Sequence, residues 1–153
     1  MLAFKERYLG NTDIEISPIG LGAWQFSEGR GGATGQWAPI VPETTDNIVE
    51  AALEGGINWF DTAEIYGGGR SERGLAHGLK TCGKKAGEVV IATKWNPLFR
   101  WANSISNTIE TRKEALAPYP IDLYQIHFPA SFSTIEKQMD ALADLIEKKE
   151  KAK

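Results

Sequence analysis

Short apolar runs alternate along the chain with longer segments in which apolar residues recur every three or four positions. Three of the runs occupy residues 57–60, 89–93 and 121–126, and each is bounded by glycine, proline or polar residues. Such runs are typical of buried parallel strands, and a crossover helix between two of them makes a unit of about 30 residues or more. The pattern therefore predicts alternating strands and helices joined by right-handed crossovers.

The intervals between these runs have helical periodicity and helix-capping signals at their ends. Helices are predicted from Thr44 or Thr45 to Gly55, from Ser71 to Gly83, from Ser104 to Pro118, and from about Thr134 to the terminus. Ser and Thr are favoured at helix starts, Gly and Pro at helix ends. Each segment carries apolar residues on one face, as expected of helices that pack against a sheet.

The N-terminal region predicts a hairpin, a first strand and a loop. Residues 4–9 and 13–17 flank Gly10-Asn11-Thr12, and the second segment alternates polar and apolar residues, which indicates a small antiparallel hairpin. Residues 19–24 predict a glycine-rich strand. Residues 27–41 predict a long loop, and loops of this length are usually functional or mobile.

Four strand–helix units in a row predict an α/β fold, either an open doubly wound sheet or part of a (β/α)₈ barrel. The hairpin favours the barrel, because it would cover the lower mouth. A full barrel needs about 250 residues, whereas this chain has 153. We therefore expect a single domain over residues 1–153: a parallel, TIM-barrel-type half-barrel of about four βα units, preceded by the hairpin. Its two unpaired sheet edges would favour self-association.

Composition and charge narrow the classes of function. A net charge of -3 with 42% hydrophobic residues describes an ordinary globular protein, and the absence of a basic, aromatic-rich face excludes nucleic acid as the expected partner. Cys82 is the single cysteine, which fits a reducing compartment, and no metal-ligand spacing is present. Because no apolar segment is long enough for a signal peptide or membrane span, we expect a cytoplasmic protein without a membrane partner.

Three chemically distinct side chains close the three apolar runs. Asp61, Lys94 and His127 are spaced 33 residues apart, and Tyr66 follows Asp61 by five. Parallel α/β folds carry their chemistry at the C-terminal ends of the strands, so we expect these side chains to converge.

This set of side chains suits proton donation to a carbonyl group. The Lys94 ammonium, held by Asp61, is expected to lower the pKa of Tyr66 toward neutrality. A neutral His127 imidazole can then hold the carbonyl oxygen. No side chain delivers hydride, so the chemistry calls for a nicotinamide cofactor.

These residues stand in motifs that resemble the N-terminal half of an aldo-keto reductase. The motifs are Tyr8-Leu9-Gly10, Ile16-Ser17, Gly20-Leu21-Gly22-Ala23-Trp24, residues 56–67 with the block Phe-Asp-Thr-Ala-x-x-Tyr-Gly, Ser71-Glu72, Ile91-Ala92-Thr93-Lys94 and Ile121-Asp122-Leu123-Tyr124-Gln125-Ile126-His127. The resemblance covers nearly the whole chain.

The resemblance implies an NADPH-dependent oxidoreductase that reduces the carbonyl of a small aldehyde or ketone to an alcohol. It implies Tyr66 as general acid, Lys94 and Asp61 as the residues that tune it, and His127 as the residue that orients the carbonyl. The implied NADPH/NADP-binding residues are Gly22, Ala23, Trp24, Asp61, Tyr66 and Lys94. The expected substrate pocket contains Trp24, Trp95 and His127, with Trp37 and Trp101 also near that rim; no metal is expected.

Structural explanations stand beside the functional ones. Asp61 could cap a turn, Lys94 could extend to solvent, and His127 could be a hydrogen-bonded core residue. His77 is expected on the surface, residues 67–70 as a flexible glycine turn, and Trp59 in the core.

The family pattern is matched only as far as the last predicted helix. Three hypotheses follow: a carbonyl reductase that is impaired in this truncated chain, a non-catalytic reductase-like binding or regulatory module, and a truncation product without independent function.

Overall fold

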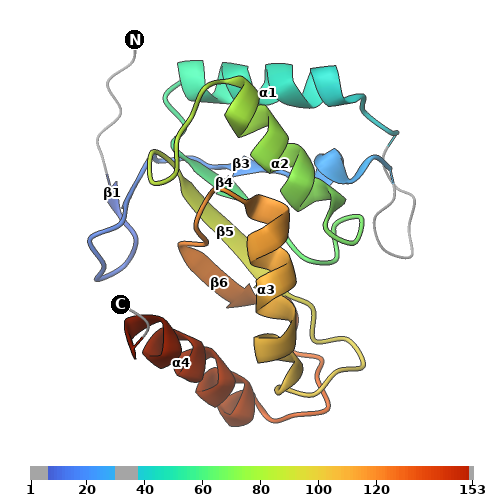
Figure 1. Ribbon diagram of the computed structural model, residues 1–153, viewed down its shortest axis with the longest axis vertical. Coiled ribbons are helices and arrows are strands. Elements are labelled where there is room, and N and C mark those ends of the chain that lie inside the picture. Colours follow the sequence, from blue (N-terminus) through green and yellow to red (C-terminus); the bar gives the residue numbers. More distant parts are fainter. Residues whose placement is uncertain (1–6, 30–37, 152–153) are drawn as a thin grey trace.

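A computed structural model describes residues 7–29 and 38–151, and it contains the predicted alternation of strands and helices (Figure 1). The elements are β1 (Arg7–Tyr8), β2 (Glu15–Ile16), β3 (Leu21–Gly22), the 3₁₀ helix η1 (Trp24–Ser27), α1 (Pro42–Glu54), β4 (Trp59–Asp61), α2 (Arg70–Thr81), β5 (Val90–Trp95), α3 (Ser104–Leu116), β6 (Leu123–Ile126) and α4 (Ile135–Lys151). Strands β3, β4, β5 and β6 form a parallel sheet in chain order, and β1 pairs with β2 antiparallel. The predicted parallel sheet and preceding hairpin are confirmed.

Several predicted boundaries were wrong in detail. Helix α1 begins at Pro42 rather than at Thr44 or Thr45, because proline has the backbone angle that the first helical position requires and its missing N–H costs nothing there. The strand predicted over residues 19–24 is only two residues long, as β3, and the chain turns into η1 at Trp24. Most of the predicted 27–41 loop lies outside the described residues.

The hydrophobic core lies between the sheet and the helices on one of its faces. Helices α2 and α3 cover this face and α1 packs beside α2 (Figure 1). The core consists of Ala23, Phe26, Val49, Ala52, Phe60, Leu75, Ala76, Leu79, Val89, Ile91, Leu116 and Tyr119. Because side chains alternate along a strand, Phe60 enters this core while its neighbours in β4 face the other side of the sheet.

Trp59 lies on that other face and joins the sheet to the hairpin. Its indole N–H donates to the carbonyl of Ser17 at 3.1 Å, and the Ser17 N–H donates to Asn58 Oδ1 at 2.7 Å. A Cβ at Gly20 would lie 2.3 Å from the indole ring, so only glycine allows this contact. We predicted Trp59 in the core, but it is half-buried and lies outside the core that the helices cover. The hairpin is thereby held at the end where the strands begin.

Helix α4 has the predicted extent, but the described residues leave its apolar stripe uncovered. Ile135, Met139 and Ile146 are 60%, 53% and 61% exposed, and Leu142 is half-buried. Its contacts are mainly with α3, and in Figure 1 it lies below β6, away from α1 and α2.

Two glycines of α2 should respond oppositely to a methyl group. A Cβ at Gly78 would lie 2.9 Å from Val49 Cγ2, and the fully buried Val49 has no room to move, whereas at Gly74 the nearest atom would be 3.5 Å away. We expect Gly78→Ala to lower the free energy of unfolding by about 1–3 kcal/mol. Gly74→Ala should raise it by up to about 1 kcal/mol, because alanine is the better helix former. Urea denaturation of both variants checks this, and equal stability of the two would contradict the close helix contact.

Candidate active site

The strands bring three of the predicted residues onto one face of the sheet. Asp61 is the last residue of β4, Lys94 lies within β5, and His127 follows β6 directly. Asp61 is paired in register with Ala92 and Lys94 with Gln125, so Lys94 and His127 each stand two positions beyond a residue on that face. Tyr66 reaches the same place from the loop between β4 and α2. The structure therefore brings all four side chains together, as the sequence predicted.

Lys94 and Asp61 form a closely bonded ion pair. Lys94 Nζ lies 2.7 and 2.6 Å from the two Asp61 oxygens and 2.8 Å from the carbonyl oxygen of Thr62. An ammonium group has three N–H donors, and these three acceptors use all of them. The side chains are 14% and 31% exposed, so water weakens the attraction only in part.

The Tyr66 ring lies among three of the other site residues. It stacks on Trp24 with centroids 5.7 Å apart, and it meets the His127 ring edge-to-face at 5.4 Å. Lys94 Nζ stands over the ring, 5.3 Å from its centroid. The phenol is thus fixed by aromatic packing and lies beside the cation.

The electrostatics differ from the sequence prediction. Burial, followed by the Asp61 carboxylate, raises the pKa of Tyr66 above its ordinary 10.0, whereas we expected Lys94 to lower it. The reason is that Lys94 is bonded to both Asp61 oxygens and lies over the ring face, so the carboxylate largely cancels its field. Tyr66 is therefore a fully protonated phenol at neutral pH.

His127 is a neutral imidazole at neutral pH. Burial, followed by the Lys94 ammonium, lowers its pKa below 6.5, and Asp61 opposes the shift. Its ring stacks on Phe128 with centroids 4.1 Å apart, and Nδ1 is buried without a hydrogen-bond partner among the described residues.

The lowered pKa of His127 predicts a pH-dependent stability. Below pH 6.5 the unfolded chain binds a proton at this imidazole that the folded chain resists, so the free energy of unfolding should fall as the pH drops from 6.5 through the folded pKa. His127→Gln should flatten the dependence of the free energy of unfolding on pH below 6.5. Urea denaturation at a series of pH values checks this, and an unchanged slope in His127→Gln would contradict the buried neutral imidazole.

The backbone beside Asp61 is open at Gly22 and enclosed at Ala23. Gly22 is paired in register with Asp61, and nothing lies within 4 Å of the position a Cβ would take there. Ala23 differs: it is fully buried, its N–H donates to the Asp61 carbonyl, and its carbonyl accepts from Ser71 Oγ. Of the predicted backbone positions, Gly22 is therefore open beside Asp61, whereas Ala23 is enclosed behind it.

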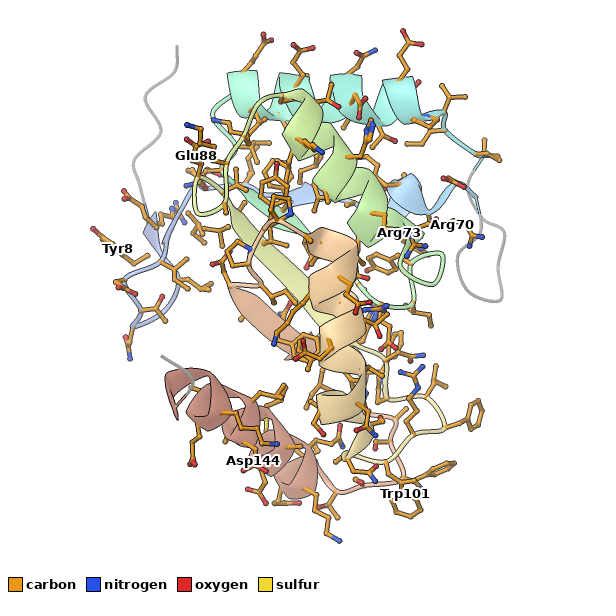
Figure 2. All side chains as sticks on the ribbon, in the orientation of Figure 1. Tyr8, Arg70, Arg73, Glu88, Trp101 and Asp144 are labelled. Carbon is orange, nitrogen blue, oxygen red and sulfur yellow. The ribbon has the colours of Figure 1, made fainter. Side chains whose placement is uncertain are left out.

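The predicted role of Trp95 in a substrate pocket is wrong. Trp95 follows Lys94 in β5, so it points to the opposite face of the sheet, where it is fully buried and its indole N–H donates to Ser104 Oγ at 3.1 Å. Trp101 is 60% exposed and projects outward in Figure 2, and Trp37 lies outside the described residues.

A buried charge network behind the site was missed by the sequence analysis. Glu72 is fully buried, accepts from Thr93 Oγ1 at 2.7 Å and lies 3.3 Å from Arg112 Nε, whose side chain is 6% exposed. Glu64 accepts from Arg100 Nη1 at 2.5 Å and lies 3.8 Å from Arg112 Nη1. The sequence does contain a signal for these charges. In the helical repeat, Glu72 and Arg112 fall on the apolar stripes of α2 and α3.

The remaining candidates have structural roles. The His77 side chain is 62% exposed and lies 3.0 Å from Asp46, and residues 67–69 form a turn in which all three glycines have positive φ. Among residues 7–29 and 38–151, no three His, Cys, Asp or Glu side chains are grouped to hold a metal. No helix in the same ranges is long and apolar enough to cross a membrane.

Known proteins resemble this chain over most of its length. The sequence profile of the Aldo/keto reductase family matches residues 18–148. Aldo-keto reductase YhdN from Bacillus subtilis is 37% identical over 145 residues, which covers 90% of this chain and 42% of YhdN. A Mycobacterium bovis protein described as uncharacterized oxidoreductase Mb2320 is 36% identical over 142 residues, covering 92% and 42%.

Solved structures share the fold. The thermostable aldo-keto reductase Tm1743, crystallised with the inhibitor epalrestat, superposes with a TM-score of 0.78 at 25% identity, over 95% of this chain and 50% of Tm1743. The chain spans less than half the length of the curated relatives that it matches. The profile nevertheless matches most of its residues, so the chain belongs to the aldo/keto reductase family of oxidoreductases.

Proposed function

We propose that this chain carries the acid–base residues of an NADPH-dependent reductase that converts the carbonyl of a small aldehyde or ketone to an alcohol. The observation that supports this most directly is the position of Tyr66, between the Lys94 ammonium at 5.3 Å and the His127 ring at 5.4 Å. Gly22, Trp24 and Asp61 would line the cofactor, which when bound supplies the hydride.

Each of the four side chains has its own role in the proposed reaction. The Tyr66 hydroxyl donates its proton to the carbonyl oxygen as negative charge develops there. Lys94 stabilises the phenolate that remains, and Asp61 fixes the direction of the ammonium group. The neutral His127 imidazole donates a hydrogen bond that orients the carbonyl oxygen.

A non-catalytic binding module is the second candidate, and one observation favours it. The raised pKa of Tyr66 and the fully bonded Lys94 leave the phenol a weaker acid than an efficient proton donor at neutral pH. Such a module would bind NADPH or a partner protein and would not consume NADPH with any aldehyde.

One experiment separates the two candidates. NADPH is titrated into the purified chain while tryptophan fluorescence is followed, and NADPH oxidation with a panel of aldehydes is then measured. We expect quenching and slow NADPH oxidation. The affinity for NADPH should be at least ten-fold weaker than that of a full-length relative, a difference in binding free energy of more than about 1.4 kcal/mol. Binding without oxidation would support the module, and no quenching would contradict the reductase.

A further inference from the structure

Three loops meet at the end of the sheet where the strands stop. The loop after β4 carries Tyr66, the loop after β5 begins just beyond Lys94, and the loop after β6 begins with His127. Figure 2 shows the direction of β5: Glu88, just before the strand, lies at the opposite side of the molecule from Trp101, in the loop after it. The contact between Tyr66 and His127 therefore depends on how these loops are held relative to one another.

Glu64 joins the first loop to the second. One carboxylate oxygen accepts from Arg100 Nη1 at 2.5 Å, and the other accepts from the Asn96 N–H at 2.9 Å. The Glu64 N–H in turn donates to the carbonyl of Lys94 at 3.1 Å. Tyr66 stands two residues further on, and its N–H donates to the carbonyl of Ala63. Glu64 lies within this tight turn, so its position determines where the turn lies.

Arg100 joins the second loop to the third. Its carbonyl accepts from the Ser131 hydroxyl at 2.8 Å and from the Phe132 N–H at 3.0 Å. The neighbouring Ala102 N–H donates to Ser133 Oγ at 2.9 Å. Arg100 therefore contacts all three loops: it belongs to one, its guanidinium reaches the carboxylate of the second, and its carbonyl holds the third.

We propose that Glu64 and Arg100 are positioning residues, which hold the loops after β4, β5 and β6 in one arrangement. They thereby set the contact between Tyr66 and His127, and this role rests on the proposed function of those two side chains. The pair is suited to it because the Glu64 side chain is 11% exposed and Arg100 35%, which shields the ion pair from much of the solvent. The main hydrophobic core lies elsewhere, between the sheet and the helices.

The test uses the two histidines of the chain as separate NMR probes. The groups facing His127 are Lys94, Asp61, Tyr66 and Phe128, and burial is the main cause of its lowered pKa. If Arg100→Met or Glu64→Gln loosens the loops, water reaches the imidazole and its pKa should rise toward 6.5.

The double variant should show no larger shift in the pKa of His127 than the larger of the two single variants, and Arg100→Lys should restore the original titration in part. The matched control is Lys113→Met, which breaks an exposed ion pair with Glu110 on α3 and should leave His127 unchanged.

The His77 signals report whether α1 and α2 remain folded against each other. An unchanged titration of His127 in Arg100→Met and Glu64→Gln, with native His77 signals, would overturn the inference. Loss of the native His77 signals in both Arg100→Met and Arg100→Lys would also overturn it, because the pair would then serve global stability. The absence of NADPH oxidation would count against the proposed function alone, since the NMR titration needs no turnover.

Discussion

Replacing Tyr66 with phenylalanine should lower the rate of NADPH oxidation with an aldehyde by about 10²–10⁴-fold, the range that a single positioned general acid contributes. Phenylalanine keeps the ring that stacks on Trp24 and meets His127, so the loop should keep its place while the proton donor is lost. NADPH binding, followed by tryptophan fluorescence, should change little. The loss should therefore appear in kcat rather than in cofactor affinity.

The matched control is Tyr8→Phe, which removes a hydroxyl from a tyrosine on the hairpin that is 64% exposed (Figure 2). Its rate should equal that of the unaltered chain. If Tyr66→Phe oxidised NADPH as fast as Tyr8→Phe, the role of Tyr66 as general acid would be excluded. A loss confined to cofactor affinity would instead make Tyr66 a packing residue.

The acidity of Tyr66 shows why a motif alone does not determine electrostatics. The pattern of strand ends correctly predicted that Asp61, Tyr66, Lys94 and His127 meet, because parallel strands bring their C-terminal ends to one edge. It did not determine how the Lys94 charge is distributed. In the structure both carboxylate oxygens of Asp61 bind the ammonium, and the pKa of Tyr66 is raised, not lowered.

The alternation of side chains along strands explains the other successes and failures. The order of strands and helices followed from hydrophobic periodicity, which depends only on which faces are buried. Trp95 was misplaced because the end of β5 was predicted at residue 93, whereas the strand continues to Trp95. Once Lys94 and Trp95 are both strand residues, they must point to opposite faces.

Buried charges were the features least accessible from the sequence. Glu72 and Arg112 lie on apolar helical stripes, which identifies them as unusual, but their pairing depends on how α2 and α3 are rotated toward each other. That rotation follows from packing across many residues. The network thus appears only in three dimensions, although its members could be recognised as candidates.

This network makes Glu72 the position at which the largest loss of stability is expected. Glu72→Ala would remove the acceptor of the Thr93 hydroxyl and the nearest carboxylate to Arg112, whose guanidinium would stay buried. Breaking a buried ion pair by removing one partner costs about 3–5 kcal/mol. We expect a fall of that size in the free energy of unfolding, measured by urea denaturation. Glu110→Ala is the control, because that side chain is 66% exposed in its ion pair with Lys113 and should cost at most about 1 kcal/mol.

Glu72→Gln tests whether the charge or the shape of the side chain matters. Burial is the main cause that raises the pKa of Glu72 above 4.5, although the Thr93 hydrogen bond and Arg112 oppose it. A carboxyl with a raised folded pKa stabilises the fold most below pH 4.5 and loses that contribution as the pH rises through the folded pKa. Glu72→Gln keeps an acceptor for Thr93 and removes the ionisable group. It should therefore lower the free energy of unfolding by less than Glu72→Ala does, and it should flatten the dependence of that free energy on pH just above pH 4.5. Equal losses in both variants would mean that the Arg112 guanidinium requires the negative charge itself, and a loss in Glu72→Ala no larger than in Glu110→Ala would contradict a buried network.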